Sequence, residues 1–224
     1  YSLLLLLLLL LHCRTRFIFF LLKAMGNCCK SKPRGVLEEK GAPPLSVSSS
    51  PRGGVDDGLS VHSWPSNTWW QARACDVPND LEGTGRSLGD TAANATLVDQ
   101  HGNEVELYQF YGKIVVLDVF AQWCGPCQAN APHGQELWED GEEQVIMLAA
   151  MQENGAGDVP QSSDLNRWVE DFGLEHPVLA DVDKTQDPYA ATGYPTYVVL
   201  DHELSIVNTD LWPFDPDYVL DLLD

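Results

Sequence analysis

A Cys-x-x-Cys pair at the junction of two contrasting segments constrains this chain more than any other feature. Residues 113–120 form an apolar, β-branched run that predicts a buried strand, and the residues from 128 onward suit a helix. Two cysteines on the turn between a buried strand and a helix are typical of a centre that opens and closes a disulfide. The residues of this motif are Trp123, Cys124, Gly125, Pro126 and Cys127.

The other four cysteines do not extend this motif into a metal site. A structural zinc site needs a second ligand pair, and no His pair at metal-ligand spacing follows the motif. Six scattered cysteines are also too few for a small fold stapled by disulfides. We therefore expect no metal and no cofactor apart from a redox-active disulfide between Cys124 and Cys127. The remaining cysteines are Cys13, Cys28, Cys29 and Cys75.

Charge is distributed unevenly along the chain. Residues 90–224 carry three basic and 26 acidic side chains, a net charge of −23, whereas residues 1–89 have a net charge of +3. A body this acidic repels phosphate backbones, so nucleic acid is excluded as a partner. The simplest interpretation of the acid excess is a solvated surface that keeps the protein soluble, and a specific basic partner is the alternative.

The first 25 residues are apolar without forming a clear membrane-spanning segment. A nine-residue leucine tract and a second apolar piece are separated by Arg14 and Arg16. Neither piece reaches the roughly 20 residues that span a bilayer. Because the chain begins with Tyr1 and not with Met, residues 1–25 are interpreted either as a signal-like or anchor-like segment or as a translated artefact.

A different start is available at Met25. Translation from that residue would expose Gly26 to myristoylation, with Cys28 and Cys29 as palmitoylation sites beside basic residues. Two lipid signals are what stable anchoring requires. Lys30 departs from the pattern, which calls for Ser or Thr at that position.

Residues 26–89 are rich in Ser, Gly, Pro and Asp. Such a composition buries too little apolar surface to order itself, so this stretch is interpreted as a low-complexity linker. Residues 64–76 are the exception, since they contain three tryptophans and Cys75. We expect this part either to dock on the folded domain or to mark the mature N-terminus.

From about residue 90 the pattern becomes that of a folded domain. It predicts a turn-rich hairpin over 95–107, buried strands over 113–120 and 144–151, and helices over 124–140 and 165–172. Further on it predicts an extended piece at 177–180, a short helix at 184–191, a hairpin over 197–207 and a helix over 215–223. This order indicates an α/β domain over 90–224, with a mixed sheet flanked by helices on both faces and an N-terminal hairpin.

The motif assigns different roles to its two cysteines. Cys124 is expected at the N-terminus of the helix, where free amides and the helix dipole stabilise a thiolate and lower its pKa. Cys124 would attack a substrate disulfide, and the less exposed Cys127 would then resolve the mixed disulfide. Gly125 permits a close approach, and Pro126 suits a first helical turn, where no backbone donor is needed.

Asp118 interrupts the apolar strand two residues before Phe120. A carboxylate at that position is expected to be buried, to have a raised pKa and to take the proton of Cys127 as that sulfur attacks. The alternative is a carboxylate at the edge of the sheet that points into water.

These residues resemble a known family. The segment from Asp118 to Cys127 resembles the active-site segment of thioredoxins, and residues 193–196 resemble the loop that carries the family's cis-proline. The N-terminal hairpin and residues 172–178 resemble the TlpA/ResA-like branch of thiol-disulfide oxidoreductases. The resemblance implies a thioredoxin fold over 90–224, with catalytic Cys124, Cys127 and Asp118. The residues that it implies for substrate binding are Trp123, Gly125, Pro126, Tyr194, Pro195 and Thr196.

Two neighbouring positions depart from that branch or add to it. Many of its members carry Glu three residues after the second cysteine, where this chain has Asn130, so Asp118 would handle more of the proton transfer. His133 lies near the motif in sequence and is interpreted as an exposed or structural residue.

The leading hypothesis is an enzyme that reduces protein disulfides, because the Gly-Pro between the cysteines resembles reducing thioredoxins. Its expected partners are disulfide-containing proteins and an upstream thiol electron donor, with a membrane tether at the N-terminus as an option. The alternatives are a redoxin-type thiol peroxidase and a non-catalytic thioredoxin-fold binding module. An anchored protein on the periplasmic face of the cell envelope is the expected location, and a lipid-anchored protein on the cytosolic face is the alternative if translation starts at Met25.

Overall fold

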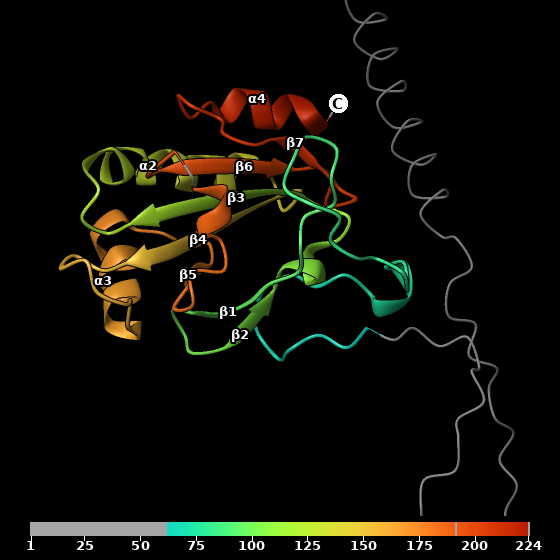
Figure 1. Cartoon of the computed structure of the whole chain (residues 1–224), viewed down its shortest axis with the longest axis horizontal. Helices are drawn as coiled ribbons and strands as arrows, with labels where there is room; N and C mark the ends of the chain where they lie inside the picture. Colours follow the sequence, from blue (N-terminus) through green and yellow to red (C-terminus); the bar gives the residue numbers. More distant parts are fainter. Residues whose placement is uncertain (1–61, 191, 224) are drawn as a thin grey trace, which may run out of the picture. The chain divides into compact units, whose positions relative to one another are not determined.

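The apolar run that precedes the cysteines forms the central strand of a seven-stranded sheet. In the computed structural model, which describes residues 62–190 and 192–223, this strand is β3 (Ile114–Ala121) and all of its residues are buried. It pairs in parallel with β4 (Val145–Glu153) and antiparallel with β6 (Thr196–Leu200). The strand order is β2-β1-β5-β4-β3-β6-β7, so the strand that leads to the cysteines has neighbours on both sides (Figure 1).

The outer strands complete a mixed sheet. They are β1 (Thr96–Asp99), β2 (Glu104–Glu106), β5 (Val178–Ala180) and β7 (Ile206–Asn208). Strand β5 runs parallel to β4, whereas β1 runs antiparallel to both β2 and β5, and β7 runs antiparallel to β6. The predicted mixed sheet with an N-terminal hairpin is confirmed.

The α-helices pack on one face of β3, which is the face formed by Ile114, Val116 and Phe120. Alternate residues of a strand point to opposite faces, so this face also receives Asp118. The Phe120 ring lies 4.7 Å from the ring of Trp168, which belongs to the helix over Ser162–Phe172. The α-helices of the described residues are α2 (Gly125–Asp140), α3 (Ser162–Phe172) and α4 (Pro216–Leu220).

The opposite face, formed by Val115, Leu117 and Val119, is covered by short 3-10 turns and by the N-terminal segment. Buried residues of η2 pack there, and Tyr189 of η3 packs against the same cluster. The 3-10 helices are η1 (Ala74–Asp76), η2 (Leu107–Phe110), η3 (Asp187–Tyr189) and η4 (Asp221–Leu223).

Residues 62–89 pack against the domain, which differs from the predicted linker over 26–89. Trp64 and Trp69 pack on the core, and the Trp69 indole donates a hydrogen bond to Asp99 at 2.8 Å. Ala72 and Val77 are buried. Trp64 and Trp69 supply much of the apolar surface of this contact, and docking on the domain was one of the two expectations for residues 64–76. Residues 26–61, like the apolar segment 1–25, lie outside the described residues.

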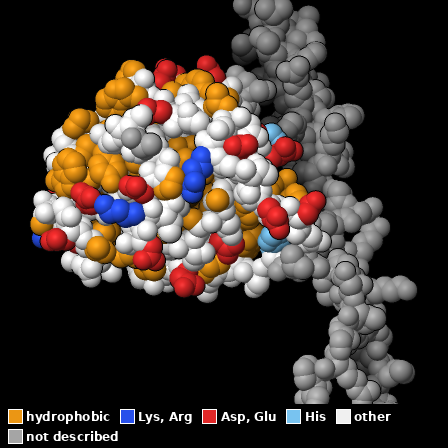
Figure 2. All heavy atoms as spheres, viewed as in Figure 1, with side chains coloured by type: hydrophobic (Ala, Val, Ile, Leu, Met, Phe, Trp, Pro, Cys, Tyr) orange, Lys and Arg blue, Asp and Glu red, His pale blue; other side chains and the backbone are white. Residues whose placement is uncertain are grey.

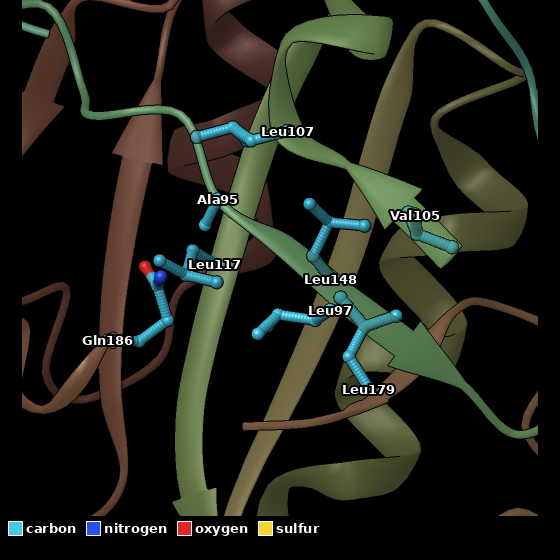
Figure 3. Close-up of a pocket in the computed structure, with 8 residues that line it drawn as sticks. All are labelled: Ala95, Leu97, Val105, Leu107, Leu117, Leu148, Leu179 and Gln186. Atoms are coloured by element: carbon cyan, nitrogen blue, oxygen red, sulfur yellow. The ribbon is translucent and has the colours of Figure 1, made fainter. Parts of the chain in front are cut away.

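Little space is left between the side chains of the hairpin β1–β2 and those of the central strands. Figure 3 shows Leu97, Val105, Leu117 and Leu148 pointing into a small apolar cavity between the hairpin and the central strands. Its volume of about 20 Å³ is close to that of a single water-sized sphere. The residues that line this small cavity are therefore packed core.

Two predicted helices differ from those observed. The short helix expected over 184–191 is only the 3-10 turn η3, because the Asp181 carboxylate accepts the backbone N–H groups of Thr185 and Gln186 and fixes a loop there. The final helix expected over 215–223 is α4 followed by the 3-10 turn η4. The helix expected to end at Gly173 does so, with that glycine at a positive φ of 65°.

Candidate active site

Cys124 occupies the N-cap position of α2, where the sequence predicted it. It forms a disulfide with Cys127, with the two Cα atoms 5.2 Å apart. The backbone N–H of Cys127 donates to Cys124 Sγ at 3.1 Å. Gly125 and Pro126 form the first helical turn, which lacks intrahelical acceptors for its amides, so partial positive charge gathers around the Cys124 sulfur.

Asp118 is buried on the face of β3 that α2 covers. It pairs in register with Tyr197 of β6, and its side chain shares a face with Val116 and Phe120. Its Oδ1 atom is buried and has no hydrogen-bond partner among the described residues. Burial raises the pKa of Asp118 to about 8. The expectation of a buried carboxylate with a raised pKa is confirmed, and its role in catalysis stays a prediction.

The loop before β6 brings the predicted proline to the cysteines. The Tyr194–Pro195 peptide bond is cis, as predicted. Thr196 pairs with Val119 at the end of β3, and its hydroxyl donates to the Gly193 carbonyl at 2.8 Å. Tyr194 packs against the apolar cluster that contains both cysteines. Segments some 70 positions apart in the sequence thus meet at one end of the sheet.

Trp123 contacts Tyr194, which the sequence analysis named, and Glu153, which it did not. Its side chain is half exposed, its ring meets that of Tyr194 edge-on at 6.0 Å, and its indole N–H donates to Glu153 Oε2 at 2.9 Å. Lys184 Nζ donates to the other oxygen of Glu153 at 2.6 Å. The hydrogen bond from Lys184, followed by that from Trp123, lowers the pKa of Glu153. Lys184 could have been noticed as one of only three basic residues after position 90.

A groove opens beside the disulfide. It has a volume of about 360 Å³ and is lined by Pro126, residues 192–195, Asp210 and Trp212. Asp210 and Trp212 come from the connection between β7 and α4, which the sequence analysis left unassigned. Trp212 is 52% exposed, which is unusual for so large an apolar side chain.

Asn130 and His133 do not take part in this arrangement through their side chains. The Asn130 amide donates to the Pro126 carbonyl within α2. His133 is exposed, as expected, and pairs with Glu136 on the same helix at 2.9 Å. Neither Asn130 nor His133 therefore replaces the Glu that many ResA-like proteins carry three residues after the second cysteine.

Within residues 62–190 and 192–223, no group of three or more His, Cys, Asp or Glu side chains is arranged to hold a metal ion. The expected absence of a metal and of other cofactors stays a prediction. None of the helices in the described part of the chain is long and apolar enough to cross a membrane.

A family model described as AhpC/TSA family matches residues 88–209, which include every residue of the candidate site except Trp212 and Asp210. Those two residues lie just beyond its end. The match covers more than half of the chain. The chain belongs to the AhpC/TSA family.

Curated relatives of this AhpC/TSA member include bacterial ResA proteins, named thiol-disulfide oxidoreductases. ResA of Halalkalibacterium halodurans is 29% identical over 121 residues, or 54% of this chain and 66% of that protein. ResA of Geobacillus kaustophilus is 31% identical over 121 residues, or 54% of this chain and 67% of the relative. The chain thus spans about two thirds of the length of these relatives.

Solved structures support the thioredoxin-like fold. The thioredoxin domain of a thiol-disulfide oxidoreductase from Bacteroides vulgatus matches with a TM-score of 0.53 at 19% identity, over 62% of this chain and 100% of that domain. A structure described as thiol:disulfide interchange protein DsbE from Chlorobium tepidum matches with a TM-score of 0.52 at 22% identity, over 62% of this chain and 96% of that chain. The expected resemblance to the ResA-like branch of the thioredoxin superfamily is confirmed.

Proposed function

We propose that this protein is a thiol-disulfide oxidoreductase that reduces disulfides in other proteins through Cys124 and Cys127. The observation that carries the proposal is the disulfide at the N-terminus of α2. Asp118, whose pKa is raised, lies on the face of β3 that α2 covers, and the loop with the cis Tyr194–Pro195 bond lies beside the disulfide. Perturbed titratable groups of this kind are frequent at functional sites. The names of the curated ResA relatives agree with the proposal.

The reaction starts from the reduced form. The Cys124 thiolate attacks one sulfur of the substrate disulfide, the substrate S–S bond breaks, and the leaving sulfur takes a proton. The amide of Cys127 already points at Cys124 Sγ and would stabilise the attacking thiolate. The product of this step is a mixed disulfide between Cys124 and the substrate.

Cys127 closes the cycle. Its thiol gives up a proton to the Asp118 carboxylate and attacks Cys124 Sγ, so that the intramolecular disulfide forms and the second substrate sulfur leaves as a thiolate. Two protein thiols are oxidised and one substrate disulfide is reduced. Because burial raises the pKa of Asp118 to about 8, this carboxyl holds a proton near neutral pH in the disulfide form. It returns that proton to Cys127 when an upstream thiol donor reopens the disulfide.

The direction, partners and location are part of the proposal. A Gly-Pro pair between the cysteines favours the reducing direction, since the motif resembles that of reducing thioredoxins. The substrates are disulfide-containing proteins, and an upstream dithiol restores the reduced form. The apolar N-terminal sequence supports a site of action outside the cytoplasm on a membrane tether.

Turnover of insulin disulfides with dithiothreitol as donor tests the proposal. The full chain should reduce insulin, Cys124→Ser and Cys127→Ser should abolish turnover, and Cys75→Ser should keep it because that residue lies on η1. Hydrogen peroxide consumption is measured in parallel. Faster turnover of peroxide than of insulin would favour a thiol peroxidase, and turnover of neither would favour a binding module.

A further inference from the structure

The groove beside the disulfide is lined by three of the residues that are expected to bind the substrate, Pro126, Tyr194 and Pro195. Pro126 stands between the two cysteines, and Tyr194 and Pro195 belong to the cis-proline loop. A polypeptide whose disulfide reaches Cys124 therefore presents a side chain next to its own cysteine to this groove. The volume of about 360 Å³ is at the lower end of the roughly 300–1,000 Å³ of small-ligand pockets, which suits one long side chain.

Two residues of the β7–α4 connection give the groove its chemistry. The Asp210 carboxylate has no hydrogen bond or ion pair among the described residues, because only the backbone groups of this residue are engaged. Trp212 offers a large exposed ring from the same wall. A free carboxylate beside an aromatic ring binds guanidinium and ammonium groups by a charge-assisted hydrogen bond together with a cation–π contact.

The two side chains are positioned by the residue between them. The Leu211 backbone N–H donates to the Tyr197 carbonyl at 2.9 Å, and the Leu211 side chain is buried in the cluster beneath α4. The Asp210 N–H donates to Asn208 Oδ1 at 2.9 Å. A buried anchor with exposed residues on either side is typical of a loop that presents those side chains to solvent.

The surrounding charge favours the same ligand. Burial raises the pKa of Tyr194, the carboxylates of Glu153, Asp181 and Asp187 raise it further, and Lys184 opposes them. Lys184 is already paired with Glu153. Figure 2 shows acidic side chains spread over the visible face with few basic ones among them. Such a field attracts a basic peptide and repels an acidic one.

We propose that this groove binds an Arg or Lys side chain close to the cysteine of the substrate disulfide, with Asp210 pairing with the cation and Trp212 stacking on it. The inference rests on the proposed function and names its substrate class: protein disulfides with a basic flanking residue. An acidic residue beside the substrate cysteine would place its carboxylate next to that of Asp210. A neutral residue there would leave the Asp210 carboxylate without a partner.

Peptide disulfides that differ only in the residue beside the cysteine test this inference. The full chain is assayed with dithiothreitol as donor on peptides with Arg, Lys, Gln, Leu or Glu at that position. We expect kcat/KM for Arg and Lys to exceed that for Gln by about tenfold, and that for Glu to lie below Gln. The Arg preference should shrink as salt is raised, because the pair is partly exposed.

Variants of the groove residues test whether the preference for Arg or Lys arises in the groove. Asp210→Asn should bring the Arg/Gln ratio of kcat/KM close to one, and Trp212→Leu should lower it severalfold. Glu104→Gln removes one exposed charge on β2, at the opposite edge of the sheet, and should keep the wild-type ratio. A change in the ratio, and not in the overall rate, is the informative quantity, because a folding defect lowers the rates for all peptides together.

Different results would overturn the inference about the groove and the oxidoreductase proposal on which it rests. An Arg/Gln ratio near one in the wild-type chain, a full ratio in Asp210→Asn, or a fastest reaction with the Leu peptide would overturn the inference and leave the oxidoreductase proposal standing. No turnover of any peptide, Gln included, would overturn the oxidoreductase proposal, and the inference would fall with it.

Discussion

The backbone amide of Cys127 donates a hydrogen bond to the Cys124 sulfur at 3.1 Å. The donor belongs to the first turn of α2, and the acceptor is the residue that caps this helix. The chain therefore points a fixed donor at the sulfur that would carry negative charge after reduction. Cys127 lies within the first turn of α2 and not at its N-cap, so none of the hydrogen bonds in the described residues points a backbone donor at its sulfur, although both cysteines are buried in the same apolar cluster.

This difference predicts that the two cysteines react differently once reduced. Cys124 should be alkylated by iodoacetamide with a pH midpoint below the value of about 8.5 for a free thiol, whereas Cys127 should react slowly throughout. Mass spectrometry after proteolysis distinguishes the sites as the pH is varied. A Cys124 midpoint at or above that of a free thiol would contradict the proposed attack.

Asp118→Asn should stabilise the disulfide form at alkaline pH. The unfolded Asp loses its proton near pH 3.9, whereas the folded carboxyl, with its pKa near 8, keeps it. The unfolded state therefore binds fewer protons between those values, and stability falls as pH rises from about 4 to 8, by at most about 6 kcal/mol. Urea unfolding across this range should show that fall in the wild-type chain and lose it in the variant. If the free energy of unfolding fell equally with pH in both proteins, the Asp118 carboxyl would be solvated in the folded state and the raised pKa would be wrong.

His176 predicts a pH dependence of the opposite sign. Burial lowers the pKa of this histidine to about 4, with a weaker opposing effect of the Pro177 carbonyl. Between pH 6.5 and 4 the unfolded state binds a proton that the folded state does not, so stability falls with acidification, by roughly 3 kcal/mol. The effect of Asp118 runs the other way in this window, so the measurement is best made in Asp118→Asn. Adding His176→Gln should remove the acid slope whatever its effect on absolute stability.

The Glu153 carboxylate is expected to position Trp123 for substrate. Glu153→Leu removes the acceptor of the indole N–H, and loss of one such hydrogen bond is worth about 1 kcal/mol, or roughly a fivefold rise in KM for a protein disulfide. Glu153→Gln keeps an acceptor oxygen and should restore most of the affinity. Lys184→Gln should change the free energy of unfolding by less than about 1 kcal/mol, because the pair with Glu153 is partly exposed. Equal KM values for the Leu and Gln variants would refute the positioning role.

The sequence predicted the central part of the fold because its signals there are local. The apolar run of β3, the helix after Cys127 and the stop at Gly173 each follow from neighbouring residues. The polar residue in an otherwise buried strand was enough to single out Asp118. Pro195 was found only through the resemblance to thioredoxins, since nothing near it in the sequence points to a site 70 residues away.

The remaining parts depend on contacts between distant segments. The tryptophans of residues 64–76 suggested that this part of the chain could dock on the domain, but the sequence alone could not show that the Trp69 indole donates a hydrogen bond to Asp99. The pairing of Glu153 with Trp123 and the approach of Trp212 to Pro126 arise from the order of the strands and have no signal in spacing or periodicity.

The most direct test of the account traps its first covalent intermediate. Cys127→Ser in the full chain removes the resolving thiol, so a substrate attacked by Cys124 stays attached. Incubation of the reduced variant with an excess of an oxidised peptide disulfide, followed by peptide mapping under non-reducing conditions, locates the bond. We expect one mixed disulfide at Cys124, and none at Cys127 in the matching Cys124→Ser variant. Absence of the Cys124 adduct, or equal trapping by both variants, would contradict it.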